Sequence, residues 1–323
     1  MVFTLVAAVG CSAPADDESS GEAGAGFPAT IETAFGAVTV PSTPKRVVTI
    51  GWGSQDAALA LGVVPVGMQD MTENNTEGDG VLPWDKPLLD GQSPKLVNYR
   101  TNNAPIAEIA ALNPDLILAV NSGLNKDEYE KLSALAPTVA YPGKPWLTSW
   151  EDQIRMVGQA LGKSEEATKL EQQTKDLIAH SRDEHPEFRE KTAMFGSATT
   201  TQNYNIYLTS DSRMQLLHEL GFKFAPNNPT EAPNFAAQIS MENLTEIQSD
   251  VLVAWYLTPE LQKQVEGSGL FRRVPAVAKH GYVPLSDKTL AYATSAVTVL
   301  SLPWMLDRYL PMLSKAAKGN ADF

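Results

Sequence analysis

Apolar positions repeat in the same order in two segments of the chain that lie about 135 residues apart. In each segment, apolar residues at a three-residue spacing precede a turn and then a run of consecutive apolar residues. With Asp115 aligned on Asp250, Ile109 matches Leu244 and Leu112 matches Ile247. The spacing predicts the inward face of a short helix, and the branched apolar run predicts a buried strand. The chain is therefore predicted to contain two similar α/β halves.

The first half alternates short apolar runs with helical patterns, which is typical of a mainly parallel sheet covered on both faces. Strands are predicted at residues 47–50, 63–68, 96–98, 116–120 and 138–141, and helices at residues 55–61, 105–112 and 126–135. A long polar loop, residues 69–94, separates the second strand from the third.

The longest helical pattern follows, from residue 150 to about residue 180, with its apolar residues on one stripe. Unbroken, it would span about 45 Å, although Gly158 and Gly162 allow a break near Gly162. Beyond it, strands are predicted at residues 192–195, 204–208, 251–256 and 282–285, and helices at residues 214–220, 241–247 and 297–313.

Two such halves favour a two-lobed protein with its ligand in the cleft between the lobes. Ligand sites concentrate between domains and at the strand ends of α/β sheets. The alternative is two packed domains with unrelated functions. The length of 323 residues exceeds what one ordinary core needs, and a chain with 43% hydrophobic and 20% charged residues is globular. The net charge of −13, without lysine and arginine runs, argues against nucleic acid as a partner.

Cys11 is the one cysteine in the sequence, and it follows the short apolar run of residues 2–10. Residues 12–26 are rich in Ser, Ala, Asp, Glu and Gly and cannot build a core. This segment resembles a bacterial lipoprotein signal, which implies a lipid on Cys11 and a flexible tether behind it. An incidental or buried thiol is the alternative. We divide the chain into a signal remnant and tether at 1–35, an N-terminal lobe at 36–148, a connecting helix at 149–188 and a C-terminal lobe at 189–323.

A series of short motifs resembles the iron-siderophore and cobalamin ABC-transporter substrate-binding proteins. The motifs occur in order at residues 43–48 and 56–67, then at 109–118, 135–137, 220–222, 239–242 and 274–277, so the resemblance spans residues 36–315. It implies an α/β fold of two Rossmann-like lobes joined by one long α-helix, with a shallow cleft. It also implies that a ferric chelate is delivered to a membrane permease and its ATPase.

The resemblance also implies roles for individual residues. Arg100 stands where ferric hydroxamate binders place an arginine that contacts the chelate, and a guanidinium suits an oxygen-rich ligand. The alternative is a surface arginine paired with Glu108. Phe235 falls near an aromatic contact position of the same binders, whereas Leu124 replaces their cleft tyrosine.

Family members of this kind dock on the permease through one glutamate in each lobe. Glu242 keeps that position in the second lobe, but the matching first-lobe position is Ala107, with Glu108 one residue away. One helical position is a rotation of about 100°, so Glu108 is turned from the expected direction. A solvated helix face or a first-turn charge is the alternative for both glutamates.

Aromatic and cationic side chains near predicted strand ends are further candidates for contact with a large, partly apolar chelate. They are Trp52, Trp84, Trp146, Tyr204, Arg213, Trp255 and Tyr292. Each is open to the alternative of core packing. Trp52 and Trp255, which follow or end a predicted parallel strand, are favoured.

A metal site in the protein itself is disfavoured because His180, His185, His218 and His280 all follow the first lobe. Iron is expected to arrive already chelated, with no resident cofactor. His218 and Glu219 form half of a metalloprotease signature, and residues 161–164 an incomplete phosphate loop. With no Gly-x-Ser-x-Gly motif either, an enzyme is not expected.

These observations favour a monomeric, extracytoplasmic receptor that is anchored to the membrane through lipid, binds a ferric siderophore and serves an ABC transporter permease. A haem or cobalamin receptor of the same fold is the second hypothesis, in which Tyr204, Tyr207 or His218 faces the metal. A secreted hydrolase is the third.

Overall fold

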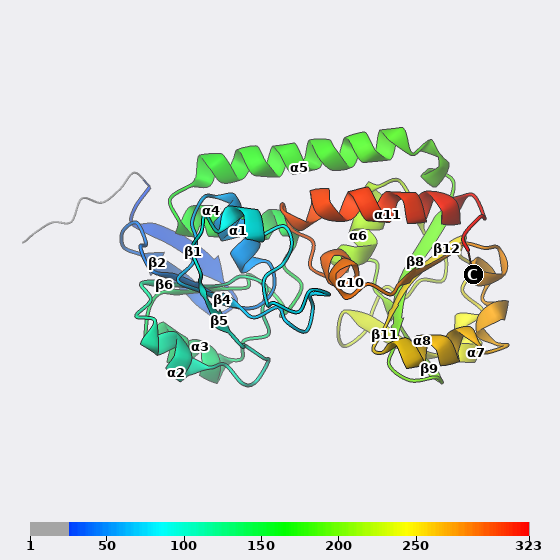
Figure 1. The fold of residues 1–323 in the computed structure, drawn as a ribbon, viewed down its shortest axis with the longest axis horizontal. Helices are drawn as coiled ribbons and strands as arrows, with labels where there is room; N and C mark the ends of the chain where they lie inside the picture. The colour runs from blue at the N-terminus through cyan, green and yellow to red at the C-terminus, as the bar shows by residue number, and fades with distance from the viewer. Residues whose placement is uncertain (1–25, 323) are drawn as a thin grey trace, which may run out of the picture.

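A computed structural model describes residues 26–322 and contains one large β-sheet in each half of the chain, besides a two-stranded hairpin in the first half (Figure 1). In the described part, the first sheet has five parallel strands in the order β5-β4-β3-β6-β7. Their bounds are Val47–Thr49 for β3, Gly67–Gln69 for β4, Lys95–Val97 for β5, Leu116–Ala119 for β6 and Thr138–Ala140 for β7. The parallel sheet predicted for this half is confirmed.

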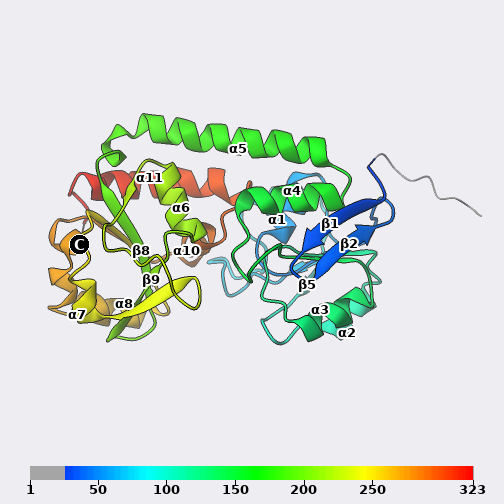
Figure 2. The ribbon, with the colours of Figure 1, turned by 180° about the vertical axis from the view of Figure 1, so that it is seen from behind.

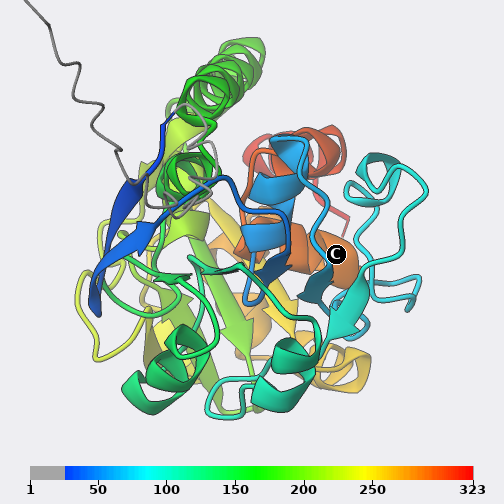
Figure 3. The same ribbon diagram turned by 90° about the vertical axis from the view of Figure 1, so that its left-hand side faces the viewer.

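Helices cover both faces of the first sheet, which explains why its strands are apolar at successive positions. Helices α1 (Ser54–Ala60) and α4 (Trp150–Ala160) lie on one side, and α2 (Ile106–Ala111) and α3 (Lys126–Ser133) lie on the other (Figures 1 and 3). Within β6, Leu116 and Leu118 join the core on the α1 side, whereas Ile117 joins the core on the other side.

The second sheet is mixed. Within residues 26–322 its strands follow the order β11-β9-β8-β12-β13, with the short β10 beside β8. Strands β8 (Thr192–Ala198), β10 (Lys223–Phe224), β12 (Val251–Tyr256) and β13 (Tyr282–Leu285) are parallel, whereas β9 (Asn203–Tyr207) and β11 (Ala236–Ser240) form antiparallel pairs. Helices α6 (Ser212–Glu219), α7 (Met241–Leu244), α8 (Pro259–Glu266), α9 (Pro275–Ala278), α10 (Lys288–Ser295) and α11 (Ser301–Ala317) surround it.

The repeat in the sequence corresponds to one construction used twice. The Asp115 carboxylate accepts hydrogen bonds from the backbone N–H groups of Lys45 and Arg46, where β3 begins, both at 2.8 Å. The Asp250 carboxylate accepts one from the backbone N–H of Thr192, where β8 begins, at 3.0 Å. Each aspartate thus precedes a central strand and fixes the start of its parallel neighbour.

The segment predicted as the longest helix contains two helices. Helix α4 ends at Ala160, and α5 runs from Ser164 to Glu184. Gly162, with φ of 67°, adopts a left-handed conformation that breaks the helix, as the glycine there allowed. The unbroken span is therefore wrong, but α5 alone measures about 31 Å at about 1.5 Å per residue. It runs along one long edge of the molecule, over both halves (Figures 1 and 2).

Several elements lie outside the sequence predictions. An antiparallel hairpin of β1 (Ala29–Thr33) and β2 (Gly36–Val40) packs against α4, and the Gln159 side chain donates a 2.7 Å hydrogen bond to the Thr30 carbonyl. Strand β11 and helices α8 and α10 are also unpredicted. Within residues 26–322, no helix is both long enough and apolar enough to cross a membrane.

Candidate functional site

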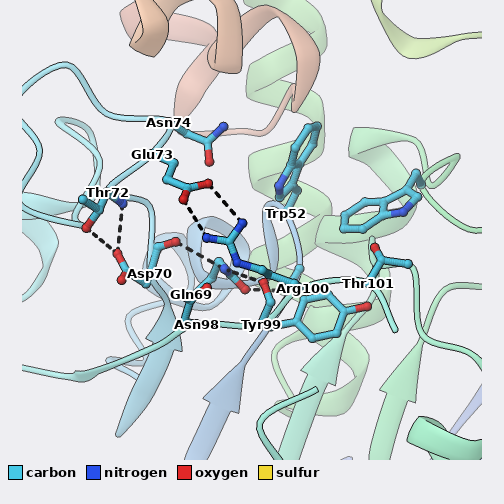
Figure 4. Close-up of a pocket in the computed structure, with 12 residues that line it drawn as sticks. Trp52, Gln69, Asp70, Thr72, Glu73, Asn74, Asn98, Tyr99, Arg100 and Thr101 are labelled. Carbon is cyan, nitrogen blue, oxygen red and sulfur yellow. Dashed lines mark hydrogen bonds and ion pairs between the residues drawn. The ribbon is translucent and has the colours of Figure 1, made fainter. Parts of the chain in front are cut away.

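A hollow of about 440 Å³ lies at the carboxyl ends of β3, β4 and β5 in the first half (Figure 4). Its lining consists of Gly51, Trp52, Gln69, Asp70, Thr72, Glu73, Asn74, Asn98, Tyr99, Arg100, Thr101 and Trp146. Ligand sites of open α/β sheets occur at this end of the strands because the loops there converge. The hollow is therefore the candidate binding site.

A second hollow of about 510 Å³ is lined by residues of both halves and shares Trp146 with the first. Its remaining lining consists of Lys144, Pro145, Leu147, Leu208, Ser210, Thr230, Glu231, Ala232, Pro233, Asn234 and Phe235. Trp146 lies in the loop after β7, and Phe235 directly precedes β11. The first hollow is lined by residues of the first half alone, and the two hollows, which share Trp146, are together called the cleft.

Gln69 ties the loops beneath the first hollow together. It is a buried polar residue at the end of β4, and its side chain accepts a 3.3 Å hydrogen bond from the Gly51 backbone N–H. The same amide donates at 3.2 Å to the Tyr99 carbonyl. Gly51 has φ of 80°, and a Cβ there would lie 2.5 Å from the Asn121 carbonyl oxygen, so the turn after β3 requires glycine.

Arg100 lies in the first hollow, where sequence analysis expected it to contact ligand. Its Nη2 lies 2.6 Å from Oε1 of Glu73, and its Nη1 lies 3.2 Å from Oε2 (Figure 4). The alternative pairing with Glu108 is therefore wrong, because the loop after β4 brings Glu73 to the guanidinium instead. The hydrogen bond and charge of Arg100 lower the pKa of Glu73. Both side chains are exposed, so the pair faces the opening of the hollow.

Trp52 and Trp146 form an aromatic wall of the hollow, with ring centroids 5.3 Å apart. Trp146 has φ of 63°, an uncommon conformation for a residue other than glycine. Strained backbone of this kind concentrates at ligand sites. The two tryptophans predicted here are thus brought together on one side of the cleft.

Tyr292 and Trp84 stand behind this wall. Tyr292 is 3% exposed, and its ring lies 5.2 Å from Trp52 and 6.4 Å from Trp84. Trp84 is 7% exposed and donates a 2.7 Å hydrogen bond to the Asp56 carboxylate. Neither residue lines either of the two hollows described, and Tyr292 packs directly against Trp52.

In the second half, Phe235, Arg213 and Trp255 gather around Tyr207. The Arg213 guanidinium lies 4.0 Å above the Tyr207 ring and forms a buried ion pair with Asp211 at 2.9 Å. The Trp255 indole donates a 3.0 Å hydrogen bond to the Tyr207 hydroxyl, and the Phe235 ring stacks on Tyr207 at 6.0 Å. Of this cluster, only Phe235 lines the second hollow. Tyr207, Arg213 and Trp255 do not line it, and Tyr207 packs against Phe235.

Tyr204 is not brought to either hollow. It is fully buried, its ring stacks on Phe271, and its hydroxyl lies 3.1 Å from that of Tyr256. Tyr204 therefore packs in the apolar interior of the second half. Its position does not support the prediction that it contacts the ligand. Leu124 is buried in the core of the first half.

Glu108 and Glu242 are exposed in the first turns of α2 and α7. Both helices lie on the long edge of the molecule opposite α5 (Figures 1 and 2). The equivalence of Asp115 and Asp250 places Ala107 at the position of Glu242, eight residues before each aspartate. The first lobe has Ala107 at this position, and its carboxylate, Glu108, lies one residue further along α2.

The polar residues of the first hollow, above all Gln69, Asp70 and Glu73, were not among the residues predicted from the sequence. Gln69 carried a signal, since a polar residue ending a buried strand needs a local partner. Glu73 carried none, because it lies in a loop without periodicity. Among the described residues, no group of three or more His, Cys, Asp or Glu is arranged to hold a metal ion.

A family model described as periplasmic binding protein matches residues 47–288. The chain belongs to the periplasmic binding protein family. The predictions of two α/β lobes and of a binding protein without enzymatic activity are thereby confirmed, as is the resemblance to substrate-binding proteins of iron-siderophore ABC transporters.

The similarity to individual members of the periplasmic binding protein family extends over most of the chain. The iron-uptake protein PiaA of Streptococcus pneumoniae, solved in complex with ferrichrome, is 30% identical, with a TM-score of 0.80, over 91% of this chain and 99% of that one. The iron(3+)-hydroxamate-binding protein of Bacillus subtilis is 24% identical over 99% of this chain and 96% of that protein. The Fe(3+)-citrate-binding protein of the same organism is 27% identical over 75% and 73%.

Proposed function

We propose that this protein is an extracytoplasmic, lipid-anchored receptor that binds a ferric siderophore in the cleft between its lobes and delivers it to an ABC importer. The observation that carries the proposal is the composition of the cleft. Trp52, Trp146 and Phe235 offer apolar faces, and Arg100 offers charged donors among them. A ferric siderophore combines an apolar shell with oxygen atoms around iron, and this set of side chains suits both.

Arg100 is the proposed polar anchor. A guanidinium has planar, fixed donors that match paired oxygen atoms, and it stays charged at every physiological pH. Its position at the mouth of the first hollow lets it approach a chelate that rests on the tryptophan wall. The relative solved with ferrichrome supports iron chelates as the class of ligand.

Delivery and anchoring are parts of the same proposal. Glu242 and Glu108, exposed on one edge of the two lobes, are the proposed permease contacts. Cys11 is the proposed site of lipidation, and it lies outside the described residues. A putative ABC-transporter substrate-binding lipoprotein of Bacillus subtilis, 24% identical over 90% of this chain, supports an anchor of this kind.

Haem or cobalamin is not favoured by any observation on the described residues. The hydroxyls of Tyr204 and Tyr207 are engaged with Tyr256 and Trp255 inside the second half. His218 packs on Phe224, and its Nδ1 lies 3.1 Å from the Phe222 carbonyl oxygen. None of the three proposed metal ligands lines either of the two hollows of the cleft.

Tryptophan fluorescence during titration tests the proposal, because Trp52 and Trp146 line the cleft. Ferric hydroxamate, catecholate and citrate chelates are titrated in parallel with haem and cobalamin. Saturable quenching by at least one ferric chelate at equimolar ratio is the expected result. A Soret band on haem addition, with no quenching by any ferric chelate, would reject the proposal.

A further inference from the structure

The charged side chains of the cleft leave no surplus of positive charge. Among the described residues that line the first hollow, Arg100 is the one cation, and Asp70 and Glu73 are anions. Lys144 and Glu231 balance each other in the second hollow. Behind it, Arg213 is already paired with Asp211. Lys288, on the neighbouring α10, acts electrostatically on Glu73 and offsets one of the two anions.

Glu73 engages both terminal nitrogens of Arg100. The two contacts, at 2.6 and 3.2 Å, form the bidentate arrangement in which a carboxylate occupies the guanidinium fork. A ligand carboxylate or catecholate oxygen would seek the same donors. To reach them, an anionic ligand must either displace Glu73 or place its own negative charge beside it.

Asp70 adds to this effect. Its carboxylate accepts hydrogen bonds from the backbone N–H and the hydroxyl of Thr72, at 2.9 and 2.6 Å, and these bonds hold it in the wall of the hollow. An anion in the hollow therefore meets two carboxylates, against the one guanidinium of the lining and Lys288 on the neighbouring α10. Like-charge juxtaposition of this kind opposes the binding of an anionic ligand and is one way in which a site discriminates between partners.

We propose that Glu73 is a specificity-determining residue, which neutralises Arg100 and restricts the cleft to ferric chelates that carry no net negative charge. Ferric trihydroxamates are such chelates, since three singly charged hydroxamates balance the ferric ion. Ferric tricatecholates and ferric dicitrate keep an excess of negative charge. The inference rests on the proposed function and names the class of siderophore within it.

The test compares the unchanged protein with Glu73→Gln, which keeps the shape of the side chain and removes its charge. Four probes are titrated by tryptophan fluorescence at fixed ionic strength: ferrichrome (neutral), ferrioxamine B (cationic), ferric dicitrate and ferric enterobactin (both anionic). Glu77→Gln is the matched control, because Glu77 lies in the same loop, is exposed and pairs with Lys86 outside the hollow. Glu73 is itself exposed, so its substitution is not expected to unfold the protein.

The unchanged protein is expected to bind ferrichrome and ferrioxamine B at least about tenfold more tightly than either anionic chelate. Glu73→Gln is expected to improve the binding of the anionic chelates by about tenfold and to weaken that of ferrioxamine B. Preference of the unchanged protein for an anionic chelate, or an equal effect of Glu73→Gln on all four probes, would overturn this inference and leave the receptor proposal standing. Failure of every ferric chelate to bind would overturn both.

Discussion

Thr298 donates a 2.6 Å hydrogen bond to the Asp56 carboxylate and so joins the second lobe to the first. Both residues are buried, and the same carboxylate oxygen accepts the 2.7 Å hydrogen bond of Trp84. Thr298 also accepts a hydrogen bond from the backbone N–H of Ser301, where α11 begins. The Asp56 carboxylate therefore links Trp84, which packs behind the tryptophan wall, to Thr298 of the second lobe.

Thr298→Val is expected to lower the free energy of unfolding by about 1–3 kcal/mol, since it leaves a buried carboxylate short of a donor. Urea denaturation measures the loss. Thr168→Val, at an exposed position of α5, is the control and is expected to change stability by less than about 0.5 kcal/mol. Equal effects of the two substitutions would show that the hydrogen bond between Thr298 and Asp56 does not contribute to the free energy of unfolding.

Stability is expected to fall as the pH rises from about 4 to above 6. Burial raises the pKa of Asp56 from 3.8 to about 6, against the opposing effect of the Thr298 and Trp84 hydrogen bonds. Burial and the charge of Asp56 raise the pKa of Asp85 well above its usual range. Because the folded chain keeps protons that the unfolded chain has released, raising the pH favours unfolding. For Asp56 the effect is at most about 3 kcal/mol.

Thermal unfolding between pH 5 and pH 8 measures this dependence. Asp56→Asn removes one titrating group and is expected to flatten the decline, whatever its effect on stability at a single pH. A decline of the same slope in Asp56→Asn and in the unchanged protein would assign the effect to other groups. Glu219, whose pKa is raised to about 7 by burial and by Glu151, is the next group to substitute in that case.

Arg100→Ala is expected to weaken the binding of a ferric siderophore by more than about 1 kcal/mol, the scale of one charge-assisted hydrogen bond. Fluorescence titration gives the dissociation constant. Arg189→Ala is the matched control, because Arg189 is exposed and pairs with Asp183 away from the cleft. A dissociation constant unaffected by Arg100→Ala would remove Arg100 from the site.

Glu242→Ala is expected to reduce iron uptake by cells while leaving the dissociation constant of the chelate unchanged, because Glu242 is exposed on α7 and lines neither hollow. Glu246→Ala, four residues along the chain and also exposed, is the control. The same measurement on Glu108→Ala tests the displaced glutamate of the first lobe. Normal uptake with Glu242→Ala would exclude this residue from permease docking.

Much of the fold could be predicted because buried strands leave a strong signal. The run that forms β6 sends alternate residues into cores on opposite faces, so every position must be apolar. Strand β11 was not predicted because it is an edge strand, paired with β9, and is only partly buried. The sequence of Ala236–Ser240 therefore lacks the run of apolar residues that marks a buried strand. Helix α8 buries Val265 alone among its residues, so its apolar stripe is too narrow to detect.

The site was predictable where it lies next to regular structure. Trp52 follows β3 by three residues, and its place in the hollow follows from the direction of that strand. Glu73 could not be predicted as the partner of Arg100, since residues 70–94 form a long loop between β4 and β5 whose path depends on contacts with the other lobe. Thr76, in that loop, donates hydrogen bonds from its backbone N–H to Thr289 and from its hydroxyl to Asp287, at 2.9 and 2.8 Å. Contacts between residues so far apart in the sequence cannot be predicted from the local pattern of apolar residues.

The position of iron in a crystal of the protein with ferrichrome shows whether the chelate binds between the lobes, because anomalous scattering locates the metal without reference to any side chain. One iron is expected between the lobes, close to Trp146 and within reach of Arg100 through the chelate. Iron bound on an outer surface, or held directly by protein side chains with the chelate absent, would contradict this expectation.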